Sequence, residues 1–237
     1  MKAMIFAAGM GTRFKPWTDQ HPKALAPVNG KSLLQRNIEY LAGFGIKDIV
    51  INVHHFANQV EKAIQVADGW GSRISISDER EALLETGGGL KKAAGYFDSG
   101  PFLVVNVDIL TDLDIGAMIR HHEQESPLAT LAVTNRHSSR YFLFNGDNRL
   151  CGWRNIATGR EIVSVPGQPL HPMAFSGIHI IEPRIFSLMQ QEGKFSMVDV
   201  YLALCATQTI SAFDHSGGKL VDVGRTESLA LAEKLFA

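Results

Sequence analysis

Ala3-Met-Ile-Phe-Ala-Ala-Gly-Met-Gly-Thr-Arg13 is a short apolar strand that runs directly into a turn containing Gly9 and Gly11. A second cation, Lys23, follows between prolines in the same loop. Glycines let a backbone approach an anion closely, while arginine offers a fork of donors and lysine a mobile point charge. This stretch therefore predicts a phosphate-binding loop at the end of the first strand of an α/β sheet.

A regular alternation of helices and strands follows the glycine turn. Ser32-Leu-Leu-Gln35 has the pattern of a capping box, and apolar residues recur after it at helical spacing. Similar patterns predict helices over residues 33–43, 57–67 and 87–94, separated by strands over 48–53, 73–77 and 101–108. Nearly continuous apolar strands are typical of a sheet that is covered on both faces. We therefore predict an α/β protein with a doubly wound, mostly parallel, Rossmann-like sheet.

The pattern changes after residue 127. A strand over 128–134 precedes two strands, 140–144 and 149–153, that flank Asn145-Gly146 like a hairpin, and the chain up to Pro172 is expected to be irregular. Strands over 174–181, 209–213 and 219–223, helices over 183–190 and 197–205, and a last helix capped by Thr226 complete the prediction. We expect one domain over residues 1–237, with a small β-rich insertion that forms part of a substrate site.

Composition narrows the class of protein. The 237 residues carry a formal net charge of −1, which gives no basic face for nucleic acid. No apolar run approaches the ~18 residues that span a bilayer, and Gly9, Gly11 and Arg13 interrupt any secretory signal. Cys151 and Cys205 have no metal-binding spacing and suggest a reducing compartment. We expect a cytoplasmic protein that binds a nucleotide, without nucleic acid or membrane partners.

The glycine turn has other possible interpretations. A dinucleotide-binding fingerprint would need a third glycine where Phe14 stands, and an acidic residue at the end of the second strand, where Asn52 stands. A Walker A loop would need Gly-Lys-Ser/Thr at the start of a helix. Arg13 and Lys23 could also be ordinary surface charges. The surrounding glycines and prolines favour a phosphate site of another kind.

Gly9-x-Gly-Thr-Arg13-x-x-Pro16-x-Thr18, followed by Pro22-Lys23-x-Leu-x-Pro27-Val28, resembles the signature of the sugar-1-phosphate nucleotidyltransferases. The resemblance continues through Leu84-Glu-Thr-Gly-Gly-Gly89, similar to the base-binding segment of that family, and Val105-Asn-Val-Asp108, similar to its metal-binding strand end. Val221-Asp222-Val-Gly224 is similar to its second metal position. The resemblance implies a GT-A-like fold with a nucleotide-binding half over about 1–127 and a sugar-binding half over about 128–237.

The resemblance also implies the roles of individual residues. Arg13 and Lys23 would neutralise the phosphates of a nucleoside triphosphate, and Asp108 and Asp222 would hold Mg²⁺. The residues expected to border the nucleotide are Ala7, Ala8, Gly9, Gly11, Thr12, Glu85, Thr86, Gly87 and Asn106. From the residues alone, Asp108 and Asp222 could equally be turn or cap residues, and the triple glycine from Gly87 could be a tight turn into a helix. Asp112 and Asp114 are expected to lie in the first turn of a helix.

Some positions depart from the family pattern. Val107 and Arg225 stand where many members have glycine and threonine, and no Glu-Lys-Pro segment is present to bind the sugar phosphate. Arg140 or Arg154 could replace that lysine, and Phe175-Ser-Gly177 is similar to the strand on the sugar side. The short chain looks most like the N-acetylmuramate-1-phosphate uridylyltransferase branch. Mannose-1-phosphate guanylyltransferase is the alternative, and a non-catalytic nucleotide sensor is the alternative of another class.

Overall fold

Strand β1 (Lys2–Phe6) is an interior strand of the main sheet in the computed structural model, which describes residues 1–236. It pairs in parallel with β4 (Asp48–Val53) on one side and β6 (Phe102–Asn106) on the other, and β5 (Arg73–Asp78) extends the sheet beyond β4. Alternate side chains of β1 enter two separate cores, Ala3 and Ile5 on one face and Met4 and Phe6 on the other. The apolar sequence of β1 therefore follows from burial on both faces.

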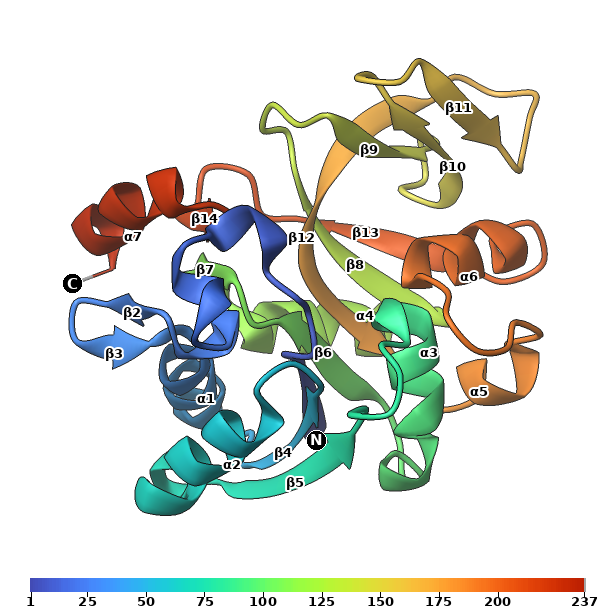
Figure 1. Cartoon of the computed structure of the whole chain (residues 1–237). Coiled ribbons are helices and arrows are strands. Elements are labelled where there is room, and N and C mark those ends of the chain that lie inside the picture. Colours follow the sequence, from blue (N-terminus) through green and yellow to red (C-terminus); the bar gives the residue numbers. More distant parts are fainter. Residues whose placement is uncertain (237) are drawn as a thin grey trace.

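Helices cover both faces of this sheet (Figure 1). The first core contains residues of α1 (Leu33–Gly43), α2 (Ala57–Val66), α4 (Ile115–Glu125) and α7 (Leu229–Leu235). The second contains residues of α3 (Glu85–Lys92), α5 (Ile185–Leu188) and α6 (Met197–Leu204). Short 3₁₀ turns cover Thr12–Phe14, Trp17–Asp19, Lys23–Leu25, Asp68–Gly71, Ala94–Tyr96 and Thr226–Ser228. The predicted α/β, Rossmann-like class is confirmed.

The long strand β12 (His171–Ile181) joins this sheet to a β-rich lobe. Its last residues pair antiparallel with β6 and with β8 (Ala129–Thr134), and β13 (Ile210–Asp214) lies beyond β8. Its first residues pair with β9 (Arg140–Phe144), followed by β10 (Leu150–Asn155) and β11 (Arg160–Val163), which form the upper lobe in Figure 1. Two short pairs are separate: β2 (Pro27–Val28) with β3 (Lys31–Ser32), and β7 (Ile109–Thr111) with β14 (Leu220–Asp222). The sheet is therefore mixed, parallel around β1 and antiparallel around β12, so the expectation of a mostly parallel sheet holds only for the part around β1.

Several local predictions were wrong. The segment expected to be irregular contains β11 and the start of β12. Thr226 does not cap the last α-helix, because a 3₁₀ turn lies between it and Leu229. Asp114 is the N-cap of α4, where its carboxylate accepts a bond from Ala117 N at 2.9 Å. Asp112 instead accepts a bond from Lys219 N, at 2.7 Å.

Other expectations concern the chain as a whole. Within residues 1–236, no helix combines the length and the apolar character that a membrane crossing requires. Cys151 and Cys205 are both free and buried. The division of the chain near residue 127 into two functional halves stays a prediction.

Candidate active site

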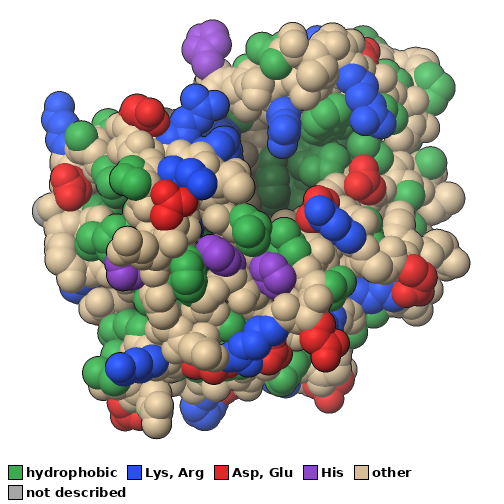
Figure 2. Space-filling view, viewed as in Figure 1, with side chains coloured by type: hydrophobic (Ala, Val, Ile, Leu, Met, Phe, Trp, Pro, Cys, Tyr) green, Lys and Arg blue, Asp and Glu red, His purple; other side chains and the backbone are tan. Residues whose placement is uncertain are grey.

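A cavity of about 610 Å³ opens where β1, β4 and β6 end. Residues at or near the carboxyl ends of these strands line it: Ala7 directly after β1, Asn52 near the end of β4, and Asp108 two residues after β6. The carboxyl ends of parallel strands are where open α/β sheets bind ligands. Figure 2 shows a deep hollow in this face, with hydrophobic side chains inside and charged side chains of both signs around its mouth. Its chemistry is therefore divided between an apolar interior and a charged rim.

The glycine turn forms one wall of the cavity. Gly11 has a φ of +59°, and a Cβ atom there would lie 2.7 Å from Thr18 Cγ2. The Thr18 hydroxyl donates to the Gly11 carbonyl at 2.9 Å, which fixes the turn. A Cβ atom at Gly9, by contrast, would meet no heavy atom within 4 Å. Gly11 is thus required by the protein's own packing, whereas the open space at Gly9 is available to a ligand.

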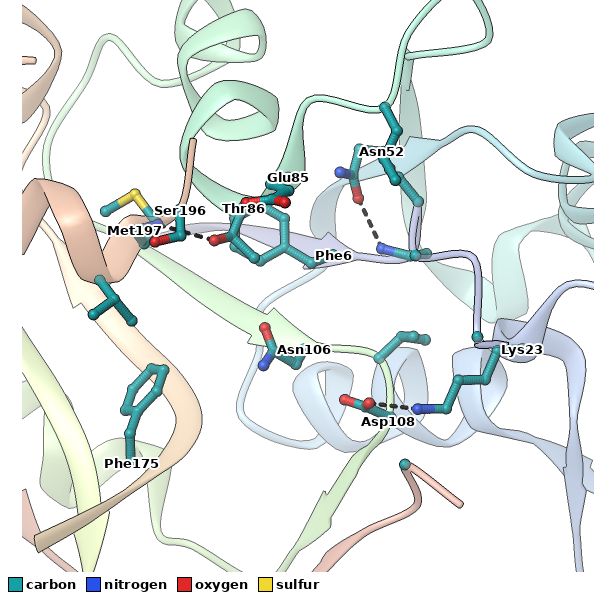
Figure 3. A pocket seen from close by; sticks show the side chains of 18 of the residues that line it. Phe6, Lys23, Asn52, Glu85, Thr86, Asn106, Asp108, Phe175, Ser196 and Met197 are labelled. Carbon is teal, nitrogen blue, oxygen red and sulfur yellow. Dashed lines mark hydrogen bonds and ion pairs between the residues drawn. The ribbon is translucent and has the colours of Figure 1, made fainter. Parts of the chain in front are cut away.

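Lys23 reaches the cavity from the loop that follows. Its side chain is only 10% exposed, its Nζ atom lies 5.9 Å from the centre of the Phe14 ring, and it donates to Asp108 Oδ2 at 2.5 Å. Figure 3 shows this ion pair beside Asn106, whose side chain also lines the cavity. This shielded ion pair keeps one cation and one carboxylate fixed beside the ends of the neighbouring strands β1 and β6.

Asp222 lies next to Asp108 although the two are distant in sequence. β14 pairs with β7, and Val223 N donates to the Asp108 carbonyl at 2.8 Å. Partial desolvation by the walls of the cleft, and then the negative charge of Asp108, raise the pKa of Asp222. A Cβ atom at Gly224 would lie 2.7 Å from Asp222 Oδ1 and 3.4 Å from Arg13 Nη2, so Arg13 flanks the same position.

The two carboxylates are a suitable donor set for a hard cation. Mg²⁺ commonly binds one or two protein carboxylates and completes its shell with waters and substrate phosphates. Within the described part of the chain, no cluster of three or more His, Cys, Asp or Glu side chains forms a closed metal cage. Asp108 and Asp222 therefore fit a shared metal–phosphate site better than a structural metal site.

Helix α3 forms the opposite wall, and its three glycines are required by packing. A Cβ atom at Gly87 would lie 2.4 Å from the Phe195 ring, one at Gly88 2.2 Å from the Gly193 carbonyl oxygen, and one at Gly89 2.6 Å from Glu79 Oε1. The segment before α6 is thus packed directly on α3. Thr86 Oγ1 accepts a bond from Met197 N at 2.9 Å and joins the two elements (Figure 3). The predicted helix start at Gly87 is corrected to Glu85.

Gly88→Ala is expected to destabilise the protein by about 1–3 kcal/mol, because the added methyl group meets backbone that cannot rotate away. Urea unfolding measures the effect. Gly43→Ala at the end of α1 is the matched control, since a Cβ atom there has open space, and its stability should stay the same or rise slightly. Equal stabilities of Gly88→Ala and the unmodified protein would show that α3 and the 191–197 segment are not in tight contact.

A buried polar network, which the sequence did not predict, lies behind this site. Asn52 Oδ1 accepts a bond from Ala7 N, and its Nδ2 donates to Glu79 Oε1, both at 2.7 Å. Glu79 is fully buried, and its other oxygen accepts a bond from Leu84 N at 3.3 Å. The carboxylate therefore connects the end of β1 with the segment that enters α3. An asparagine near the end of a buried strand was the only local signal.

The far side of the cavity is aromatic. Phe142 and Phe175 pack edge to face at 5.7 Å, and Phe175 packs in the same way on His179 at 5.3 Å. Gly177 lies between the two β12 residues with a φ of +74°, where a Cβ atom would be 2.8 Å from Asn106 Nδ2. The segment Phe175-Ser-Gly177 thus approaches the cavity as the sequence suggested, with the Phe175 ring forming the surface.

His179 is buried and hydrogen-bonded to Tyr201, and burial lowers the pKa of the imidazole to about 3. In the unfolded chain the imidazole of His179 binds a proton near pH 6.5, whereas in the folded protein it stays neutral at that pH. The stability that this residue contributes is therefore fully present above pH 6.5 and is lost as the pH falls towards 3. The expected loss from this residue between pH 8 and pH 5 is about 2 kcal/mol.

The measurement is urea unfolding at pH 8 and at pH 5, for the protein and for His179→Phe. The free energy of unfolding of His179→Phe should fall by about 2 kcal/mol less between these pH values than that of the unmodified protein. His137→Gln, which replaces an exposed histidine, is the control for the loss of a histidine elsewhere in the chain. Identical pH dependences for the protein and His179→Phe would contradict a neutral buried imidazole.

The structure brings most of the predicted site residues to this one cavity. Those that line it are Ala7, Ala8, Gly9, Gly11, Thr12, Arg13, Lys23, Glu85, Thr86, Asn106 and Asp108. Gly87 is instead buried against Phe195, and Asp222 lies beside Asp108 just outside the lining. Of the two candidate arginines, Arg140 lines the cavity, whereas Arg154 forms an ion pair with Glu161.

Comparison with known proteins gives one consistent family. Residues 2–235 match the nucleotidyl transferase family model. The N-acetylmuramate alpha-1-phosphate uridylyltransferase of Caulobacter vibrioides is 34% identical over 210 residues, covering 86% of this chain and 84% of that protein. The protein of the same name from Neisseria meningitidis serogroup B is 31% identical and covers 99% of this chain and 98% of its own. HddC from Yersinia pseudotuberculosis, solved with GMP-PN, has a similar fold, with a TM-score of 0.81 at 22% identity over 100% of this chain and 99% of that chain.

Proposed function

The chain belongs to the nucleotidyl transferase family, and we propose that it transfers a nucleoside monophosphate from a nucleoside triphosphate to a sugar-1-phosphate, releasing pyrophosphate. The observation that carries this proposal is a single cavity that combines the glycine turn, the cations Arg13 and Lys23, and Asp108. The relatives named as N-acetylmuramate alpha-1-phosphate uridylyltransferases support UTP and N-acetylmuramate-1-phosphate as the substrates.

In the proposed reaction, an oxygen of the sugar phosphate attacks the α-phosphorus of the nucleotide. One P–O bond forms there, the bond to the β-phosphate oxygen breaks in line with it, and pyrophosphate leaves. The attacking phosphate is already ionised, so no general base is needed. The work of the protein is to align the two substrates and to neutralise their charge.

The residues of the cavity have complementary roles in this proposal. Arg13 binds phosphate oxygens through its planar fork of donors. The mobile ammonium group of Lys23 stabilises the negative charge that develops on the leaving pyrophosphate. The backbone amides of the turn at Gly9 and Gly11 face the phosphates. Glu85 and Thr86 border the base.

Asp108 and Asp222 are the proposed ligands of Mg²⁺. When bound, this ion neutralises phosphate charge and fixes the orientation of the phosphate oxygens. Lys23 already neutralises Asp108 in the protein, at 2.5 Å. The charges of the two carboxylates and the two cations cancel, so a bound Mg²⁺ would supply the positive charge that offsets part of the charge of a triphosphate.

Pyrophosphate release from four nucleoside triphosphates, each paired with several sugar-1-phosphates, tests the proposal. UTP with N-acetylmuramate-1-phosphate is expected to be the fastest pair. Turnover confined to GTP with mannose-1-phosphate would select the guanylyltransferase alternative. Tight nucleotide binding without pyrophosphate release from any pair would instead indicate a non-catalytic sensor.

A further inference from the structure

The first half of β9 presents an arginine and a phenylalanine to the same space. Successive side chains of a strand point to opposite faces, so Arg140 and Phe142 lie on one face and Tyr141 on the other. Arg140 and Phe142 both line the cavity, whereas the Tyr141 hydroxyl accepts a bond from Ser138 N at 2.8 Å. The strand therefore places one cation next to the aromatic wall.

This wall offers few partners for sugar hydroxyls. Phe142 and Phe175 have no polar side-chain atoms, and Met197 and Val198 complete the apolar lining. His179 and Tyr201 also line it, but they are each 1% exposed and bond to one another through Nδ1 and the hydroxyl. A hydroxyl group buried without a hydrogen-bond partner is unfavourable. The wall suits an acyl or alkyl substituent better than a hydroxyl-rich sugar face.

Arg140 itself has a guanidinium group that the protein does not use. Over residues 1–236, no carboxylate lies within ion-pair distance of it, and its side chain forms no hydrogen bond. Arg154, on the neighbouring strand β10, shows the contrast, because Glu161 of β11 neutralises it. The free guanidinium at the edge of an apolar wall is suited to an anionic group of the ligand.

We propose that the acceptor sugar phosphate carries a carboxylate together with an apolar substituent, and that Arg140 binds this carboxylate while the Phe142–Phe175 wall contacts the substituent. This inference rests on the proposed function and concerns the choice of sugar. N-acetylmuramate has both groups in its lactyl ether, which carries a carboxylate and a methyl group. N-acetylglucosamine lacks the lactyl carboxylate, and mannose presents hydroxyls alone.

The test compares kcat/KM with UTP for N-acetylmuramate-1-phosphate and for N-acetylglucosamine-1-phosphate. The unmodified protein should prefer the former, and Arg140→Gln should reduce this preference by about 10- to 100-fold, the size expected for a charge-assisted hydrogen bond. Arg140→Lys should retain part of the preference, since charge remains without the planar fork. Arg154→Gln is the matched control and should leave the ratio unchanged.

Four results would overturn the inference. An equal loss of kcat/KM with both sugars would mean that Arg140 contacts the phosphate that they share. Unchanged kcat/KM values with both sugars would mean that Arg140 does not contact the acceptor. A protein that uses mannose-1-phosphate and rejects N-acetylmuramate-1-phosphate would refute the carboxylate but keep the nucleotidyl transfer, whereas no turnover with any sugar would remove both proposals. Thermal unfolding of each variant shows whether a loss reflects folding.

Discussion

Asp108→Asn is expected to lower kcat for pyrophosphate release by at least about 10²- to 10³-fold while the protein stays folded. The substitution keeps the size of the side chain and removes its negative charge, which is the feature that a hard cation and Lys23 both require. The carboxylate is partly exposed to the cavity, and its loss also relieves repulsion of Asp222. The fold should therefore tolerate the change.

The measurement is single-turnover release of pyrophosphate, with urea unfolding and nucleotide binding recorded for the same variant. Asp114→Asn is the matched control from the same segment, because asparagine caps a helix as well as aspartate does and Asp114 lies outside the cavity. Unchanged turnover of Asp108→Asn would remove Asp108 from the proposed metal site.

The sequence predicted the parts of the fold that depend on short-range patterns. Apolar runs such as 48–53 and 102–106 are strands because both faces of a central sheet are buried, and this burial selects apolar residues along the strand. Strand β11 was missed because it is an exposed edge strand, in which Arg160 and Glu161 face solvent. Its position is determined by pairing with β10 rather than by its own residues.

In the candidate site, too, the features within one stretch of sequence were predicted, and those that join distant segments were not. The glycine turn and its cations lie within one stretch of sequence, so spacing alone indicated phosphate chemistry. The pairing of Asp108 with Asp222 depends on β14 reaching β7, which no local pattern encodes, and only the family resemblance suggested it. The Asn52–Glu79 contact and the aromatic wall were not predicted, because each joins strands or helices whose neighbours are set by the tertiary fold.

Lys23→Met is expected to lower kcat/KM by about 10²- to 10³-fold, the range measured when a charge-stabilising group is lost from a reacting centre. Methionine preserves most of the packing of the aliphatic stem and removes the charged Nζ atom, together with its contact with the Phe14 ring. Lys15→Met is the matched control in the same loop. Lys15 is 63% exposed and pairs with Asp19 at 2.9 Å, so its loss should change kcat/KM less than threefold, as expected for a surface ion pair worth about 0–1 kcal/mol.

The double variant Lys23→Met/Asp108→Asn shows whether the ion pair acts as one unit. When two residues stabilise the same charge, the reductions in kcat/KM caused by the single substitutions do not multiply. The kcat/KM of the double variant should therefore be only slightly lower than that of the more impaired single variant. Losses that multiply would mean that Lys23 and Asp108 stabilise different parts of the reaction, and that their 2.5 Å contact is incidental to it. A kcat/KM for Lys23→Met within threefold of the unmodified protein would exclude the lysine from charge stabilisation altogether. The contact between the loop cation and the strand-end carboxylate then becomes a structural feature, and Arg13 alone carries the phosphate chemistry of the loop.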